Sequence, residues 1–269
     1  TFKQGVTDLM EFGSHNYMAI YVLTALPNTP FRDPEYIDEY GIKLVETKRP
    51  FYHNSFMKDQ TPETETIVVG TDTMTYEDWK MAYMYRWLFT FGHFLGHTQF
   101  ISRFLRNHYQ ITYYEFYEKL MNYSIRNKKT LLGTEFIETY DAMIRSVEGF
   151  DYWGRVVPKV SDVTWDSDEA TALTIMDNLE EFYDEIKDFL HDSLSEYIER
   201  DEDGVEIIED VIEYQKVRLF KFNTEYPRKV TLNYNVYEVA EKGEVLKNTT
   251  HDLVAIDEKV TDGISANVG

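Results

Sequence analysis

The chain has 269 residues, which is enough for one large domain or two smaller ones with proper cores. Aromatic residues make up 16% of it, so its high charge does not come with the low hydrophobicity that disorder requires. It carries 48 acidic and 27 basic residues, and the net charge of −21 repels polyanions. We therefore expect neither nucleic acid nor an anionic membrane surface as a partner, and the absence of a long apolar run predicts no membrane span.

The sequence contains no cysteine. This excludes disulfides, a thiol nucleophile, a zinc–thiolate site and an iron–sulfur cluster ligated within this chain. A cysteine-free composition fits a reducing compartment, and the first residues do not form a basic segment followed by an apolar one. We therefore expect a cytoplasmic protein.

The first part of the chain has the pattern of an α/β unit. Apolar residues at helical spacing predict a helix over 2–12 that ends at Gly13. The nearly continuous apolar run from Tyr17 to Leu26 predicts a strand buried on both faces, as in a parallel sheet. Because the chain starts as if already inside a helix, we expect this βα repeat to lack its beginning.

The expected strand opens into the turn Pro27-Asn28-Thr29-Pro30, which cannot continue a ladder because proline lacks an N–H. In a parallel barrel or sheet, the turns at the carboxyl ends of the strands are where ligands bind. An ordinary surface turn is the alternative interpretation of these four residues.

From about residue 75 the pattern becomes helical. Thr75 and Asp78 form a capping signature for a helix predicted to extend towards Asn107. Shorter signals predict an acidic helix over 33–40 stopped by Gly41, a strand over 66–69, helices over 112–124, 131–147, 167–199 and 205–221, and a strand over 230–239 with a hairpin through Gly243. We therefore predict an α+β protein that is mainly α-helical, with one domain over 1–60 and a helical domain over 61–269 ending in a β-hairpin.

His93 and His97 are the candidate metal ligands, since histidines four apart lie on one face of a helix. No Glu lies between them, as a zinc-protease helix would need, and no third ligand is evident. The aromatic stripe around them favours packed or hydrogen-bonded core histidines, so we expect no metal site. The carboxylates are too numerous to single out a catalytic pair, and the chain taken alone shows no catalytic constellation.

The order of helix, apolar strand and Pro-Asn-Thr-Pro turn resembles the late part of the radical S-adenosylmethionine (radical SAM) barrel, a partial TIM-type barrel in which such a turn follows the sixth strand. Other segments are similar to the cobalamin-binding group of this family, and the resemblance covers roughly residues 1–200. These segments are Asp33-Pro34-Glu35-Tyr36, Tyr40-Gly41-Ile42, 46–50, 67–74, Glu77-Asp78-Trp79, Trp153-Gly154-Arg155 and 165–170.

The resemblance implies a parent enzyme in which an upstream Cys-x-x-x-Cys-x-x-Cys loop holds a [4Fe–4S] cluster that cleaves S-adenosylmethionine, while an N-terminal domain carries cobalamin. Many such enzymes methylate unactivated carbon, and others cyclise or rearrange their substrates. This chain lacks the cluster cysteines, the cobalamin domain and most of the barrel. It is expected to bind no cofactor alone and to need the missing N-terminal part of the same polypeptide.

The resemblance also gives this chain a place in the parent enzyme. It would form a cavity wall and a substrate-side cap, with Pro27, Asn28, Thr29 and Pro30 on the side of S-adenosylmethionine or of an unknown small-molecule substrate.

Two other hypotheses stay open. A self-contained acidic helical module for binding or scaffolding would have a closed core, whereas an enzyme fragment would expose a barrel edge at 17–26 and tend to associate. A metalloenzyme built on His93, His97 and scattered carboxylates is the third.

Overall fold

The computed structural model describes residues 1–55, 61–219 and 228–255. Helices dominate these residues, and their strands form three separate two-stranded sheets. This agrees with the predicted mainly helical α+β class, but the described residues contain no parallel sheet and no closed barrel.

The chain divides into two compact units. Unit 1 comprises Thr1–Leu95 and Tyr114–Phe189, and unit 2 comprises Gly96–Tyr113 and Leu190–Gly269. The division into 1–60 and 61–269 followed the change of the sequence from an α/β to a helical pattern, and it stays a prediction.

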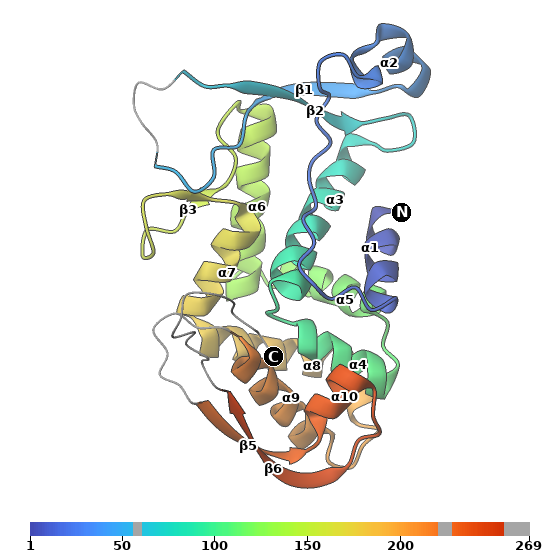
Figure 1. The fold of residues 1–269 in the computed structure, drawn as a ribbon, viewed down its shortest axis with the longest axis vertical. Helices are drawn as coiled ribbons and strands as arrows, with labels where there is room; N and C mark the ends of the chain where they lie inside the picture. The colour runs from blue at the N-terminus through green and yellow to red at the C-terminus, as the bar shows by residue number, and fades with distance from the viewer. Residues whose placement is uncertain (56–60, 220–227, 256–269) are drawn as a thin grey trace, which may run out of the picture. The chain divides into compact units, whose positions relative to one another are not determined.

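Unit 1 is a set of helices with two small antiparallel sheets (Figure 1). β1 and β2 pair from Lys43 opposite Gly70 to Lys48 opposite Thr64. The elements of this unit are α1 (Phe2–Glu11), η1 (Pro30–Arg32), α2 (Pro34–Tyr40), β1 (Lys43–Lys48), β2 (Thr64–Gly70), α3 (Tyr76–Phe89), η2 (Thr90–Phe94), most of α5 (Tyr113–Arg126), α6 (Leu131–Glu148), β3 (Arg155–Val156), β4 (Thr164–Trp165), α7 (Ser167–Asp177) and the first part of α8 (Leu179–Ile198).

The ends of several helices confirm the capping signals of the sequence. Thr75 and Asp78 form a complete capping box at the start of α3. Gly41, in the left-handed region at φ 57°, ends α2, and Gly13 at φ 87° follows α1. Two predicted helices are interrupted: the one over 167–199 at Asn178, between α7 and α8, and the one extending towards Asn107 after Phe89.

The core of unit 1 is aromatic. Trp87, Phe89, Phe91 and Tyr117 are fully buried, and the rings of Trp87 and Phe91 lie 4.7 Å apart. α3 and its π-helical extension η2 contribute most of these rings. Their burial stabilises the fold and fixes α3 in place.

The segment 17–26 is extended, but it is not the strand buried on both faces that its composition predicts. Only Thr24 forms a bridge, with Ile67 of β2, supported by hydrogen bonds from Ala25 N to Thr66 O (2.8 Å) and from Val68 N to Leu23 O (2.9 Å). Exposure alternates along the segment, and the exposed side includes Tyr21 at 86%. The prediction was wrong because an apolar run does not reveal whether neighbouring strands cover it.

Unit 2 contains α4 (Gln99–Tyr109), α9 (Gly204–Arg218), α10 (Val236–Lys242) and an antiparallel pair of β5 (Arg228–Tyr234) and β6 (Asn248–Ala255). The predicted terminal β pair is confirmed, but its first strand ends at Tyr234 and α10 lies in the connection where a hairpin through Gly243 was expected. Gly243, at φ 69°, ends α10. Within the described residues, no helix is long and apolar enough to cross a membrane.

Candidate functional site

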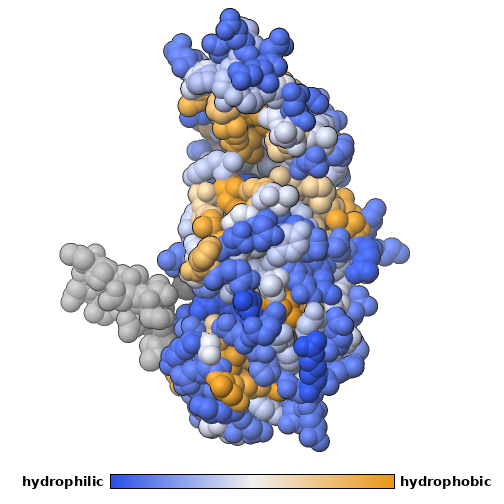
Figure 2. All heavy atoms as spheres, turned by 90° about the vertical axis from the view of Figure 1, so that its right-hand side faces the viewer, coloured by the Kyte–Doolittle hydropathy of each residue, from blue (hydrophilic) through white to orange (hydrophobic). Residues whose placement is uncertain are grey.

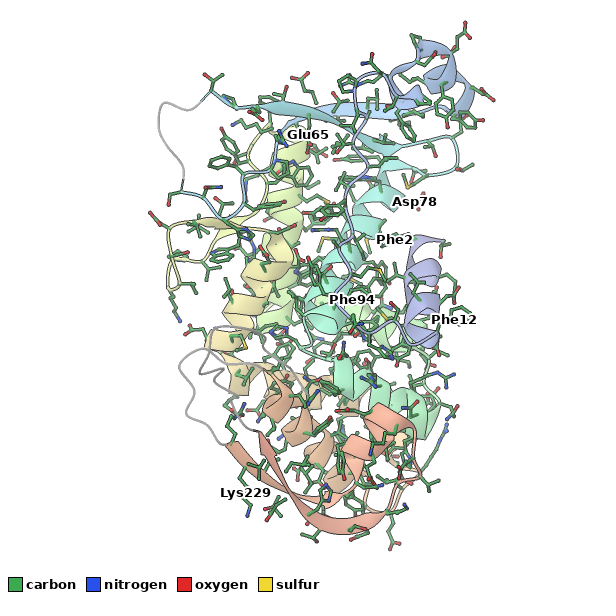
Figure 3. The ribbon with its side chains drawn as sticks, in the orientation of Figure 1. Phe2, Phe12, Glu65, Asp78, Phe94 and Lys229 are labelled. Atoms are coloured by element: carbon green, nitrogen blue, oxygen red, sulfur yellow. The ribbon has the colours of Figure 1, made fainter. Side chains whose placement is uncertain are left out.

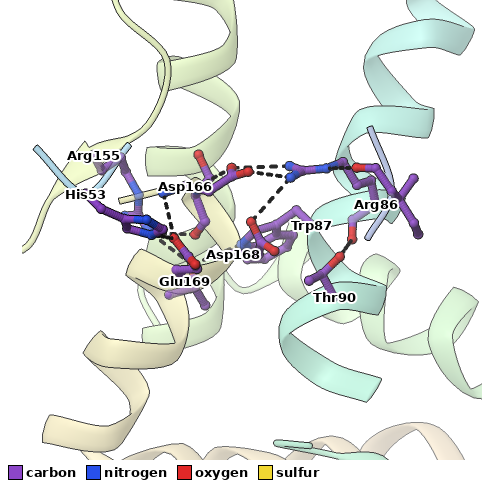
Figure 4. Close-up of polar contacts among 11 residues, drawn as sticks. His53, Arg86, Trp87, Thr90, Arg155, Asp166, Asp168 and Glu169 are labelled. Atoms are coloured by element: carbon purple, nitrogen blue, oxygen red, sulfur yellow. Dashed lines mark hydrogen bonds and ion pairs between the residues drawn. The ribbon is translucent and has the colours of Figure 1, made fainter. Parts of the chain in front are cut away.

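A cavity of about 430 Å³ lies within unit 1. Its walls come from the extended segment 17–24, the loop 50–53, the middle of α3 and the first turn of α7. Polar side chains from these elements converge on it (Figure 4). Concave sites with aromatic walls and a few convergent polar groups are the usual places for small-molecule ligands.

Arg86 is the central cation of this cavity. It follows Trp79 and Tyr83 by seven and three residues, so it lies on the buried face of α3. Its Nε donates to the carbonyl oxygen of Ile20 (2.6 Å), which ties the extended segment to the helix. Its two terminal nitrogens form a bidentate ion pair with Asp166, and one of them lies 3.6 Å from Asp168 Oδ1.

The acidic side of the cavity is the start of α7. Asp166 caps the helix by accepting from the backbone N–H of Ser167 (2.6 Å), and Glu169 Oε2 accepts from the N–H of Asp166 (3.2 Å). Asp168 lies in the same first turn, where the helix dipole favours negative charge. In sequence, the segment 165–170 stands out only by its family resemblance, whereas the structure makes it one wall of the cavity.

Asp168 is the perturbed carboxyl of this site. Burial, followed by the charge of the neighbouring Asp166, raises its pKa to about 7 against the opposing effect of Arg86. Its side chain is 4% exposed, and Oδ1 accepts no hydrogen bond from the described residues. A carboxyl in this state can hold or release a proton near neutral pH, or it can pair with a donor brought by a ligand.

A histidine–carboxylate pair lies beside this cluster. His53 Nε2 and Glu169 Oε2 are 2.8 Å apart, and the His53 ring packs against Trp165 with centroids 5.3 Å apart. The backbone N–H of His53 donates to Thr164 O (2.7 Å), which holds the loop on β4. His53 has φ 61°, an uncommon conformation for a non-glycine residue that recurs at functional sites.

The remaining wall is aromatic. The rings of Tyr83 and Trp153 lie 5.7 Å apart, and both line the cavity together with Tyr52. Burial, followed by the charge of Asp166, raises the pKa of Tyr52 and of Tyr83 above the ordinary value. Both phenols therefore stay neutral and act as hydrogen-bonding and packing groups.

A second polar network supports α7 from behind. Thr171 accepts from Trp87 Nε1 (2.9 Å) and from Arg155 (2.8 Å), and it donates to Glu135 (2.7 Å). Arg155 also pairs with Glu135. The network joins α3, α6, the β3 strand and α7, which fixes Arg86 and the acidic turn relative to each other (Figure 4).

Pro27, Asn28, Thr29 and Pro30, the predicted cofactor side of the barrel, form a turn that leads into η1 and do not line this cavity. Asn28 has φ 63°, and Thr29 Oγ1 donates to Leu26 O (2.7 Å). Arg32 holds the turn through bonds to Ala25 O (2.9 Å) and Thr66 Oγ1 (2.6 Å). Their assignment to a cofactor or substrate stays a prediction.

His93 and His97 do not share a helix face. α3 ends at Phe89, η2 ends at Phe94, and the boundary between the units follows Leu95. His93 is buried, with its ring nitrogens 3.0 Å from His15 Nδ1 and 3.0 Å from the Tyr117 hydroxyl. The described residues contain no group of three or more His, Asp or Glu side chains that could hold a metal ion.

Sequence reasoning missed Arg86, Tyr52 and His53. The available signal was a lone arginine on an aromatic helix face, three residues after Tyr83. A charge on a buried face needs partners, so it predicts carboxylates nearby in space. It does not identify them among 48 acidic residues.

Comparison with known proteins gives two curated relatives among its matches, and no family model matches the chain. One is a cobalamin-dependent radical SAM methyltransferase, TokK, of Streptomyces tokunonensis, 32% identical over 137 residues. The other is a 2-(S-pantetheinyl)-carbapenam-3-carboxylate methyltransferase of Streptantibioticus cattleyicolor, 31% identical over 137 residues. Each match covers 51% of this chain and 20% of the relative, so about half of this chain is similar to a fifth of two methyltransferases.

Proposed function

We propose that this chain is the C-terminal part of a cobalamin-dependent radical SAM enzyme and forms the substrate-side wall and cap of its site. The parent enzyme would carry out a radical-based transfer such as C-methylation in the cytoplasm. The observation that carries the proposal is the similarity to two methyltransferases over half of the chain. The cavity at Arg86 supplies the place where such a wall would meet a small molecule.

The residues of this chain do not fit the iron–sulfur cluster. Cluster ligation needs cysteine thiolates, and the sequence has none. We therefore assign the cluster, S-adenosylmethionine and cobalamin to the N-terminal part of the same polypeptide. No chemical step is assigned to this chain, whose residues would position substrate and exclude water.

The exposed side of the segment 17–26 supports the role of a wall. Tyr17, Tyr21, Leu23 and Leu26 are 64%, 86%, 48% and 57% exposed, and Phe12, at the end of α1 in Figure 3, is 88% exposed. Figure 2 shows apolar areas between hydrophilic ones on the surface of unit 1. An extended apolar edge of this kind is suited to pair with further strands, as the last strand of a barrel would.

The experiment that tests the proposal is the sequence of the reading frame upstream of Thr1 in the source DNA. A continuous frame with Cys-x-x-x-Cys-x-x-Cys supports it, and the whole protein should then form 5′-deoxyadenosine from S-adenosylmethionine under reducing conditions. A start codon immediately before Thr1, with no such frame, overturns it. The acidic helical binding module would then be the better description.

A further inference from the structure

The carboxyl of Asp168 is incompletely satisfied by the described residues. Asp168 is 3% exposed, Oδ1 exposes less than 1 Å² and accepts no hydrogen bond from them, and the nearest guanidinium nitrogen is 3.6 Å away. A buried polar atom without a donor costs about 1–3 kcal/mol, and more when it is charged. In native proteins such a group calls for an explanation, and a bound water, an ion, a ligand or a role in a reaction are the usual ones.

The cationic side chains of the cavity do not neutralise its carboxyl groups. Arg86 is engaged by Asp166 and by the carbonyl of Ile20, yet it faces two carboxyl groups. His53 pairs with Glu169. Glu65, also on the cavity wall, has its pKa raised by burial.

Four carboxyl groups, those of Glu65, Asp166, Asp168 and Glu169, therefore line the cavity with one guanidinium and one imidazole. The potential inside favours a further positive charge.

The cavity has the size and the walls for an organic ligand. Its volume of about 430 Å³ lies within the range of roughly 300–1,000 Å³ that is typical of small-molecule pockets. Tyr52 and Trp153 line it beside the acidic turn, and aromatic faces attract organic cations. Asp168 is itself one of the residues that line the cavity, so its carboxyl is within reach of a ligand bound there.

We propose that this cavity binds the cationic nitrogen of an organic ligand, a primary amine or a guanidinium, through the Asp168 carboxyl. Arg86, which pairs with Asp166, lies 3.6 Å from that carboxyl, and Tyr52 and Trp153 flank the carbon skeleton. The inference names the substrate class of the cavity and in that sense rests on the proposed function. It differs from what the name of the second relative describes, a substrate bearing a carboxylate.

The test is isothermal titration of this chain with three probes that share a phenylethyl group: 2-phenylethylamine, 2-phenylethanol and 3-phenylpropanoate. The titrations are run at pH 8, where Asp168 is mostly ionised, since its pKa is about 7. The amine should bind about tenfold more tightly than the alcohol, which is the usual size of one charge-assisted pair, and the carboxylate should not bind. Neither S-adenosylmethionine nor a metal cofactor is needed, so this result is independent of the test of the proposed function.

Asp168→Asn removes the charge with almost no change of shape and should weaken amine binding about tenfold. Asp177→Asn is the matched control on the same helix, because Asp177 pairs with Lys159 at the surface. It should leave amine binding unchanged. The proposal is overturned if the amine does not bind at millimolar concentration, if the carboxylate binds as tightly as the amine, or if Asp168→Asn binds the amine as the unchanged chain does.

Discussion

Two buried aspartates, one in each unit, differ in how their charge is satisfied. Asp168 in unit 1 and Asp210 in unit 2 are 3% and 7% exposed, and burial raises the pKa of both. The carboxylate of Asp210 accepts from the backbone N–H groups of Asn233 (2.6 Å) and Tyr234 (2.8 Å), which lower its pKa. Asp168 faces a second carboxyl instead. Asp210 therefore links β5 to α9 by hydrogen bonds, whereas Asp168 Oδ1 can still accept a hydrogen bond from a ligand.

The largest expected effect comes from removing the cation of the unit 1 cluster. Arg86→Met should lower the free energy of unfolding by about 3–5 kcal/mol, because the buried Asp168 and the half-buried Asp166 lose their cationic partner. Urea unfolding measures it. Arg49→Met is the control, since Arg49 and Glu63 form an exposed pair worth about 1 kcal/mol at most. Equal losses in the two variants would contradict the central role of Arg86.

The second prediction is a gain in stability on removing the Asp168 carboxyl, and the size of the gain depends on pH. The folded state binds the Asp168 proton up to about pH 7, and the unfolded state releases it near its ordinary pKa of 3.8, so this group destabilises the fold as pH rises between these values. Asp168→Asn should therefore be more stable than the unchanged chain at pH 8. The gain should be at most about 4 kcal/mol, since the pKa of Asp168 rises by about 3 units and each unit corresponds to about 1.4 kcal/mol.

Thermal and urea unfolding at pH 4, 6 and 8 check this prediction. The advantage of Asp168→Asn should shrink towards pH 4, where the carboxyl is protonated in the folded state and about two fifths protonated in the unfolded state. A difference that stays constant over this range would show that Asp168 does not titrate near neutral pH in the folded chain.

Asp210→Asn tests the comparison of the two aspartates in unit 2. It should raise the free energy of unfolding at pH 8 by less than Asp168→Asn does, because the N–H groups of Asn233 and Tyr234 oppose the effect of burial on the ionised carboxylate. Urea unfolding at pH 8 measures the change, with Glu209→Gln, at an exposed neighbouring position, as the control. A gain in stability at pH 8 as large as that of Asp168→Asn would remove the difference between the two aspartates.

The smallest expected effect concerns the extended edge of unit 1. If the apolar side of 17–26 lacks a partner, the chain should self-associate, and the double change Tyr21→Ser with Leu23→Ser should weaken this association several-fold. Sedimentation equilibrium measures it. Val205→Ser in unit 2, which removes a side chain that is 68% exposed, should leave the association unchanged. A chain that stays monomeric at high concentration would argue for the self-contained module.

The local signals of the sequence determined much of the secondary structure. The box of Thr75 and Asp78, the left-handed Gly41 and the strand around 66–69 all lie where they were predicted. These features depend on backbone groups within a few residues, which the sequence contains in full. Short segments of the sequence also indicated the similarity to radical SAM methyltransferases, because a resemblance of this kind depends on residue order alone.

Only the tertiary structure showed where the site lies and whether the apolar segment 17–26 is covered by other strands. Whether 17–26 is covered depends on which strands lie beside it, and whether Asp168 is perturbed depends on Asp166 and on Arg86, more than 80 residues earlier in the chain. The break of the aromatic helix after Phe89, which puts His93 in η2 and His97 beyond its end, is likewise seen only in the structure. Caps and turns are short-range and can be read from neighbouring residues, whereas burial and charge pairing are long-range and exist only once the chain has folded.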